Sequence, residues 1–225
     1  MNREQLKNMA KEQIKGKTLT LFGIVLVGLI ICLVALYIPM FVAIITFVIG
    51  GAASILGVLL YIVGFVAYIG ALGCFSISMV TMYLNLTKGI QPQFSDLKIG
   101  LKNYKSNIIL LLLTFLYTLL WMLLFYVPGI IKAISYSMAP YILAENPDMK
   151  PSDAIKESML ITNGRKWEIF VLELSFIGWI LLSCVTCNLS MIYVMPYMQA
   201  TYANYYNSIK RNIAITENTD NSENV

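Results

Sequence analysis

Long apolar stretches constrain this chain more strongly than any other feature of its sequence. Four of them are obvious, and only the last contains a charged residue, Glu173. They cover residues 18–38, 56–86, 108–127 and 169–186. A helix of about 20 apolar residues crosses the hydrocarbon core of a bilayer, which is ~30 Å thick. Charged residues make up only 12% of the chain, against roughly 25% in soluble domains, so most of it is expected to face lipid.

The positive charges are placed unevenly, and this placement predicts how the chain is threaded. All but one of the 16 lysines and arginines fall in four clusters, at residues 3–17, 88–105, 150–166 and 210–211. Basic residues close to the ends of spans stay on the cytoplasmic side of the membrane. If all four clusters are cytoplasmic, an even number of crossings separates each pair. Residues 129–144 must therefore bring the chain back after the crossing at residues 108–127.

The sequence thus predicts an all-α fold, a polytopic membrane helical bundle with six transmembrane helices arranged as three hairpins. The spans are expected at residues 18–38, 56–86, 108–127, 129–144, 169–186 and 191–206. They form a single integral membrane domain, residues 1–211, with the N- and C-termini in the cytoplasm. The uncharged segment 39–53 either dips into the outer interface or extends the first two helices. The polar tail, residues 212–225, is expected to be disordered.

Each hairpin is preceded by a segment with the pattern of a basic amphipathic helix. The apolar faces consist of Leu6, Ala10 and Ile14 in the first segment, Leu97, Leu101 and Tyr104 in the second, and Ala154, Ile155 and Met159 in the third. Ser95 and Ser152 are the expected N-caps of the second and third helices, and Asn163-Gly164 ends the third. Such helices lie in the headgroup plane, with their lysines toward anionic lipid. They either anchor and orient the spans or dock to a partner or to particular lipids.

Two charged residues, Lys132 and Glu173, are expected inside spans. Lys132 lies three residues past the outer turn at Pro128-Gly129, where it can snorkel to the headgroups or face an anionic ligand from a pocket. Glu173 lies about 9 Å past Trp167, near the inner end of the fifth span. Intramembrane carboxylates are candidates for functional sites, although Glu173 can also simply face the bundle, hydrogen-bonded or protonated. A salt bridge between the two residues requires a broken fourth span.

Other candidate positions in the membrane are prolines and amides. Pro140 and Pro196 each remove a backbone hydrogen bond and are expected to kink the fourth and sixth spans. Asn188, Gln199 and Asn204 are expected to bond helix to helix, and a transport pathway is the alternative. Five tyrosines have the pattern of an interfacial belt: Tyr193, Tyr197, Tyr202, Tyr205 and Tyr206.

The sequence offers no catalytic, metal or cofactor site. Histidine is absent, which removes the commonest metal ligand. Cys184 and Cys187 form a C-x-x-C, but no second pair accompanies them, so a zinc site is not expected and a disulfide stays open. No H-E-x-x-H, paired intramembrane carboxylates or phosphate-binding glycine loop is present. An enzyme is therefore not expected, and neither is a nucleic-acid partner.

Residues 135–183, "SYSMAPYILAENPDMKPSDAIKESMLITNGRKWEIFVLELSFIGWILLS", together with "VMPYMQATYANYYNSI" at 194–209, carry a family resemblance. The chain resembles a set of six-span integral membrane proteins of unknown function, common in Gram-positive bacteria. That set is distantly similar to the membrane domain of some glycerophosphodiester phosphodiesterases. The resemblance implies a location in the plasma membrane and no established activity. It brings no catalytic residues, because the phosphodiesterase chemistry lies in a separate soluble domain.

Two functions follow as hypotheses. The first is a non-catalytic membrane protein that binds protein partners, a second copy of itself, or lipids, with anionic headgroups at the cytoplasmic face. Roles of this kind include an accessory factor in envelope stress, assembly or immunity. The alternative is a transporter or lipid-translocating protein that uses the kinked fourth and sixth spans, because broken helices frequently line substrate sites.

Overall fold

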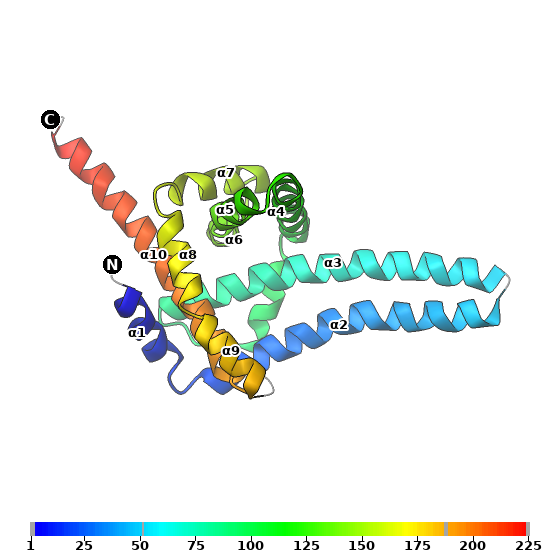
Figure 1. Cartoon of the computed structure of the whole chain (residues 1–225). Coiled ribbons are helices and arrows are strands. Elements are labelled where there is room, and N and C mark those ends of the chain that lie inside the picture. The colour runs from blue at the N-terminus through cyan, green and yellow to red at the C-terminus, as the bar shows by residue number, and fades with distance from the viewer. Residues whose placement is uncertain (1–2, 51, 187–188, 224–225) are drawn as a thin grey trace.

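The computed structural model describes residues 3–50, 52–186 and 189–223, and over these residues the chain is all-helical, as expected. The elements in chain order are α1 (Arg3–Ile14), α2 (Thr18–Ile49), α3 (Ala52–Thr87), the 3-10 helix η1 (Phe94–Leu101), α4 (Tyr104–Leu124), α5 (Tyr126–Tyr136), α6 (Ala139–Glu145), α7 (Pro151–Ile161), α8 (Lys166–Leu174), α9 (Ile177–Val185) and α10 (Met191–Glu223). The hairpin of α2 and α3 projects away from the rest of the molecule (Figure 1).

Five helical segments in the described part of the chain are long and apolar enough to cross a membrane. They are Thr18–Ile49, Ala53–Thr87, Tyr104–Leu124, Tyr126–Glu145 and Lys166–Val185. The expected sixth span, residues 191–206, is not among them. Tyrosines and amides interrupt its apolar sequence, which lowers its hydropathy below that of the other five.

Of the two alternatives for segment 39–53, the structure shows the extension of the first two helices. α2 continues to Ile49, α3 starts at Ala52, and Gly50 after α2 has a φ of +78°. Pro39 lies inside α2, and Gly64 of α3 packs directly against its ring. At 1.5 Å per residue, the 32 residues of α2 span about 48 Å, more than the ~30 Å hydrocarbon core. Large apolar side chains near the tip are exposed, among them Phe47 and Val48.

The second hairpin pairs α4 with α5, and Gly129 lets α5 approach the α4 backbone at Met122. Figure 1 shows α4 and α5 foreshortened where α2 and α3 lie lengthwise. The second hairpin therefore lies at an angle to the first.

The expected fourth span is broken into α5 and α6. Pro140 lies in the first turn of α6, where its missing N–H is not needed, so it starts a helix instead of kinking one. The break leaves the carbonyl of Ser135 without a helical partner in the usual register. The hydroxyl of Ser158 on α7 donates to that carbonyl at 2.7 Å, and the hydroxyl of Thr162 donates at 3.4 Å. Neighbouring hydroxyls thus satisfy the backbone group that the break exposes.

Two of the three amphipathic segments, α1 and α7, bury their apolar faces against protein. Leu6, Ala10 and Ile14 of α1 are at most 1% exposed and lie where α1 packs on α10. On α7, Ala154 and Ile155 are buried in the same way and Met159 is half-buried, where that helix packs on α4, α5 and α6. The expected stripe of the second segment is not covered in this way, because Leu101 and Tyr104 are exposed.

The second amphipathic segment and the two predicted N-caps differ from the sequence prediction. The second amphipathic segment is the 3-10 helix η1, which leaves Leu101 exposed. Ser95 is not its N-cap, because Gln93 takes that place and its N–H donates to the Asp96 carboxylate at 3.0 Å. Ser152 is not the N-cap of α7 either, because Lys150 precedes Pro151 there. Both serines lie one or two residues inside helices that start earlier.

The end of the chain forms a third antiparallel pair, in which α10 runs back beside α8 and α9. The hydroxyls of Ser183 and Ser190 lie 2.7 Å apart at one end, and Tyr205 of α10 bonds Glu168 of α8 at the other. The helix then continues to Glu223, through most of the tail expected to be disordered. No glycine or proline follows Pro196 to end it.

A close contact fixes the connection between α3 and α4. The hydroxyl of Ser78 accepts from the Gly100 N–H at 2.9 Å and donates to the Leu97 carbonyl at 2.9 Å. The Asn107 amide donates to the Gly100 carbonyl at 2.7 Å. A Cβ on residue 100 would collide with the Cys74 carbonyl oxygen and lie 2.6 Å from the Ser78 hydroxyl.

Replacing Gly100 by alanine is expected to lower the free energy of unfolding by about 1–3 kcal/mol, because the α3 backbone must move to make room. Thermal unfolding of the purified protein in detergent measures this. Gly178→Ala is the matched control, since nothing lies within 4 Å of its Cβ position. That variant should be neutral or slightly stabilised, and equal losses in both variants would contradict the packing argument.

Candidate functional site

The C-terminal helix carries three tyrosines on one face, at Tyr202, Tyr205 and Tyr206. Residues three and four apart in a helix are neighbours on its surface. Tyr205 and Tyr206 are only 5% and 4% exposed, so this face of α10 points into the protein. The interpretation of these residues as an interfacial belt is therefore wrong. Of the five tyrosines, only Tyr193 is exposed by more than a third.

Each of the three tyrosines faces a different carboxylate. Tyr205 donates its hydroxyl to Glu168 at 3.2 Å, Tyr206 donates to Glu145 at 3.0 Å, and Tyr202 lies beside Glu173. A carboxylate removed from water is stable only with hydrogen-bond donors or positive charges beside it. We call these six residues the tyrosine–carboxylate junction. They join α10 to α8 and to α6.

Glu145 also holds two lysines. Lys210 of α10 lies 2.6 Å from one carboxylate oxygen, and Lys88, just after α3, lies 4.0 Å from the other. The Glu145 side chain is 15% exposed, whereas both lysines reach solvent. The carboxylate is therefore compensated on both oxygens, and the ends of α3 and α6 meet on α10.

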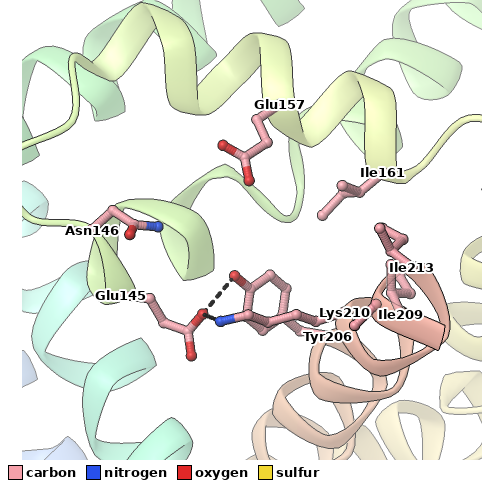
Figure 2. Close-up of a pocket in the computed structure, with 9 residues that line it drawn as sticks. Glu145, Asn146, Glu157, Ile161, Tyr206, Ile209, Lys210 and Ile213 are labelled. Atoms are coloured by element: carbon pink, nitrogen blue, oxygen red, sulfur yellow. Dashed lines mark hydrogen bonds and ion pairs between the residues drawn. The ribbon is translucent and has the colours of Figure 1, made fainter. Parts of the chain in front are cut away.

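A pocket of about 260 Å³ opens beside this carboxylate. Figure 2 shows Glu157 pointing into it from α7, opposite the pair of Tyr206 and Lys210. Its remaining walls are mainly apolar and include Ile161, Ile209 and Ile213. Because Glu145 already accepts from Tyr206 and Lys210, it is positioned as a structural anion and not as a free general base.

The two charged residues predicted inside spans do not meet. Glu173 is half-buried beside Tyr202, which agrees with the simpler of its two interpretations. The Lys132 amine lies 5.0 Å from the centre of the Trp121 ring on α4, a cation–π contact. Although the fourth span is broken, the structure forms no salt bridge between Lys132 and Glu173 within the residues it describes.

The other predicted positions have separate environments. Pro196 is buried inside α10, which continues through it, and Gln199 is half-buried. Asn204 exchanges two hydrogen bonds with Gln13 of α1, at 3.1 and 2.8 Å. It therefore bonds helix to helix, but to α1 and not to a membrane span. Asn188 lies outside the described residues.

The cysteines do not form a metal site in the part of the chain that the structure covers, where no three His, Cys, Asp or Glu side chains come together. Cys32 and Cys74 are buried free thiols, and Cys184 is exposed. Cys187 lies outside the described residues, so the predicted possibility of a Cys184–Cys187 disulfide is not tested.

Sequence analysis missed Glu145, Glu168 and Lys88 as members of a site. The available signal was the spacing of Tyr202, Tyr205 and Tyr206, which places all three on one helix face. An interfacial belt needs no such register, because rings at the headgroup level can lie on any face of a helix.

Together, these features define an all-helical protein with several helices apolar enough to span a membrane. Residues 125–213, from α5 to the middle of α10, match the family described as "Protein of unknown function (DUF975)", so this part of the chain carries that domain. It includes the stretches on which the family resemblance was based. The curated proteins contain no match to the chain. The solved structures contain none either.

Replacing Tyr206 by phenylalanine tests the junction. The variant keeps the ring, which stacks on Tyr141 with centroids 5.4 Å apart, and loses the donor to Glu145. Hydrogen bonds to charged groups contribute about 1.5–3 kcal/mol, so the free energy of unfolding in detergent should fall by this amount. Tyr193→Phe on the same helix is the control and should change it by less than about 0.5 kcal/mol. The junction would have no special role if the two losses were equal.

Proposed function

We propose that this chain is a non-catalytic, multi-pass protein of the plasma membrane that binds lipids or protein partners. The observation that carries the proposal is the tyrosine–carboxylate junction. Glu145 and Glu168 accept hydrogen bonds from tyrosines of α10, and Glu145 also pairs with lysines, which favours a structural role for these carboxylates. The exposed surface carries many large apolar side chains instead, on the α2–α3 hairpin and also on α4 and α9.

The proposed topology has both termini in the cytoplasm and six crossings. Its support is that the expected cytoplasmic segments meet: Lys88 contacts Glu145, and the Asn103 amide donates to the Pro147 carbonyl at 2.7 Å. The segment that follows α3 and the segment at the end of α6 therefore lie side by side, as two segments on one side of a membrane would. Because α10 runs antiparallel beside α8 and α9, it crosses the same part of the membrane as that pair, in the opposite direction.

Lipids extracted together with the protein in native nanodiscs test the proposal. We expect anionic phospholipids to be enriched over the bulk membrane, by about twofold or more, because basic side chains near the surface each favour anionic lipid by about 1 kcal/mol. Proteins crosslinked in the same preparation would identify a partner or a second copy. A lipid profile equal to the bulk, with no crosslinked partner, would refute the proposal.

Transport or lipid translocation is the second candidate, and one observation favours it. Two of the five candidate spans are discontinuous, with breaks between α5 and α6 and between α8 and α9. Discontinuous helices line substrate sites in many transporters.

Glu173→Gln separates this candidate from the first. If Glu173 couples transport, reconstituted vesicles should move solute or lipid, and the variant should abolish the movement. If Glu173 only packs beside Tyr202, the variant should fold with little loss of stability, because the amide oxygen of glutamine still accepts from a tyrosine hydroxyl, and vesicle permeability should match that of empty vesicles. Tyr202→Phe, which removes the hydroxyl and keeps the carboxylate, is the control.

A further inference from the structure

Three cationic residues of α1 gather at the break between α8 and α9. Arg3, Lys7 and Lys11 are four residues apart, so they share one side of the helix. The Lys7 amine lies 4.6 Å from the centre of the Phe176 ring. Phe176 is one of the two residues between α8 and α9. The Lys11 amine lies 5.7 Å from the centre of the Tyr197 ring on α10.

These side chains line an open pocket of about 390 Å³. Its other walls are Glu4 and Asn8 of α1, Ser175 and Tyr197. Three cations therefore face one carboxylate. Within the described residues, no ion pair of Arg3, Lys7 or Lys11 with an acidic side chain is formed. The pocket keeps a net positive charge that the protein itself does not neutralise.

The environment of Lys7 shows the same imbalance. Burial lowers the pKa of the Lys7 amine below its ordinary value, and the positive charges of Arg3 and Lys11 lower it further. Their backbone positions, four residues apart on one helix, keep the three cations close to one another. A bound anion would relieve both their repulsion and the loss of water around the amine.

The position of the pocket favours a lipid over a soluble anion. Ser175 lines the pocket and belongs, like Phe176, to the candidate span Lys166–Val185, so the cations lie beside a segment that is apolar enough to enter lipid. Directly after Phe176, α9 exposes Ile177, Trp179, Ile180 and Leu181, an apolar surface on which an acyl chain can lie.

We propose that the pocket of Arg3, Lys7 and Lys11 at the α8–α9 break binds the phosphate of an anionic phospholipid headgroup. The acyl chains of this lipid lie along α9. The inference rests on the proposed lipid-binding function and gives it a site. A lipid bound there contacts α1, α9 and α10 together, so it also fixes the N-terminal helix on the membrane-embedded part of the chain.

The test uses the full-length protein in detergent, titrated with short-chain phosphatidylglycerol and followed by native mass spectrometry. We expect saturable binding that phosphatidylcholine does not reproduce. The double variant Lys7→Gln with Lys11→Gln should weaken it by at least about tenfold. Lys15→Gln with Lys17→Gln removes the same charge from the same basic segment, but outside the pocket lining, and should weaken binding by less than about twofold. Lys7→Arg with Lys11→Arg should restore it, which separates loss of charge from loss of folding.

Three results would overturn the assignment. Equal losses in the two glutamine pairs would show general attraction to a basic surface. Displacement of phosphatidylglycerol by inorganic phosphate alone, with matching affinity, would show a soluble-anion site. If the wild type prefers phosphatidylglycerol but Lys7→Gln with Lys11→Gln has no effect, this pocket is wrong while the proposed lipid-binding function stands. No preference in the wild type would remove both.

Discussion

The Glu145 carboxylate is the group on which the polar contacts between helices converge. It accepts from Tyr206 and Lys210 of α10 and lies 4.0 Å from Lys88, just after α3. A largely buried carboxylate needs donors or positive charges beside it. Tyr205 of the same helix bonds Glu168 of α8, so a rotation of α10 would break both tyrosine bonds at once. The ends of α3 and α6 are held in place by the same group of residues.

The elements themselves could be predicted from the sequence because they depend on local patterns. Uninterrupted apolar length predicted the long helices, and the spacing of Leu6, Ala10 and Ile14 predicted the buried face of α1. What covers that face could not be predicted in the same way. An apolar stripe has the same appearance whether lipid or protein covers it. The predicted N-caps were wrong for a similar reason. Ser95 and Ser152 are residue types that favour N-cap positions, but both helices start earlier, with Gln93 and Lys150 as their N-caps.

The site was harder to predict than the fold because its contacts are long-range. Gln13 and Asn204 are 191 positions apart, and nothing in either neighbourhood marks the other as its partner. The same is true of Lys88, Glu145 and Lys210. Sequence reasoning selected Glu173 as a polar residue inside a span, and the structure places it half-buried beside Tyr202. It selected Lys132 as well, but its contact, the Trp121 ring, is an aromatic surface, which a search for opposite charges does not reveal.

The length of the first hairpin links the protein to the thickness of its membrane. An apolar helix longer than the local hydrocarbon layer must tilt or thicken the layer around it, at a fraction of a kcal/mol for each ångström of mismatch. Because α3 runs without interruption from the hairpin tip to Thr87, and Lys88 follows it directly, a change of tilt also moves the Thr87 end of this helix. A thicker bilayer stands this rod upright and a thinner one inclines it, so the composition of the surrounding lipid adjusts the angle at which α3 meets the polar contacts on α10.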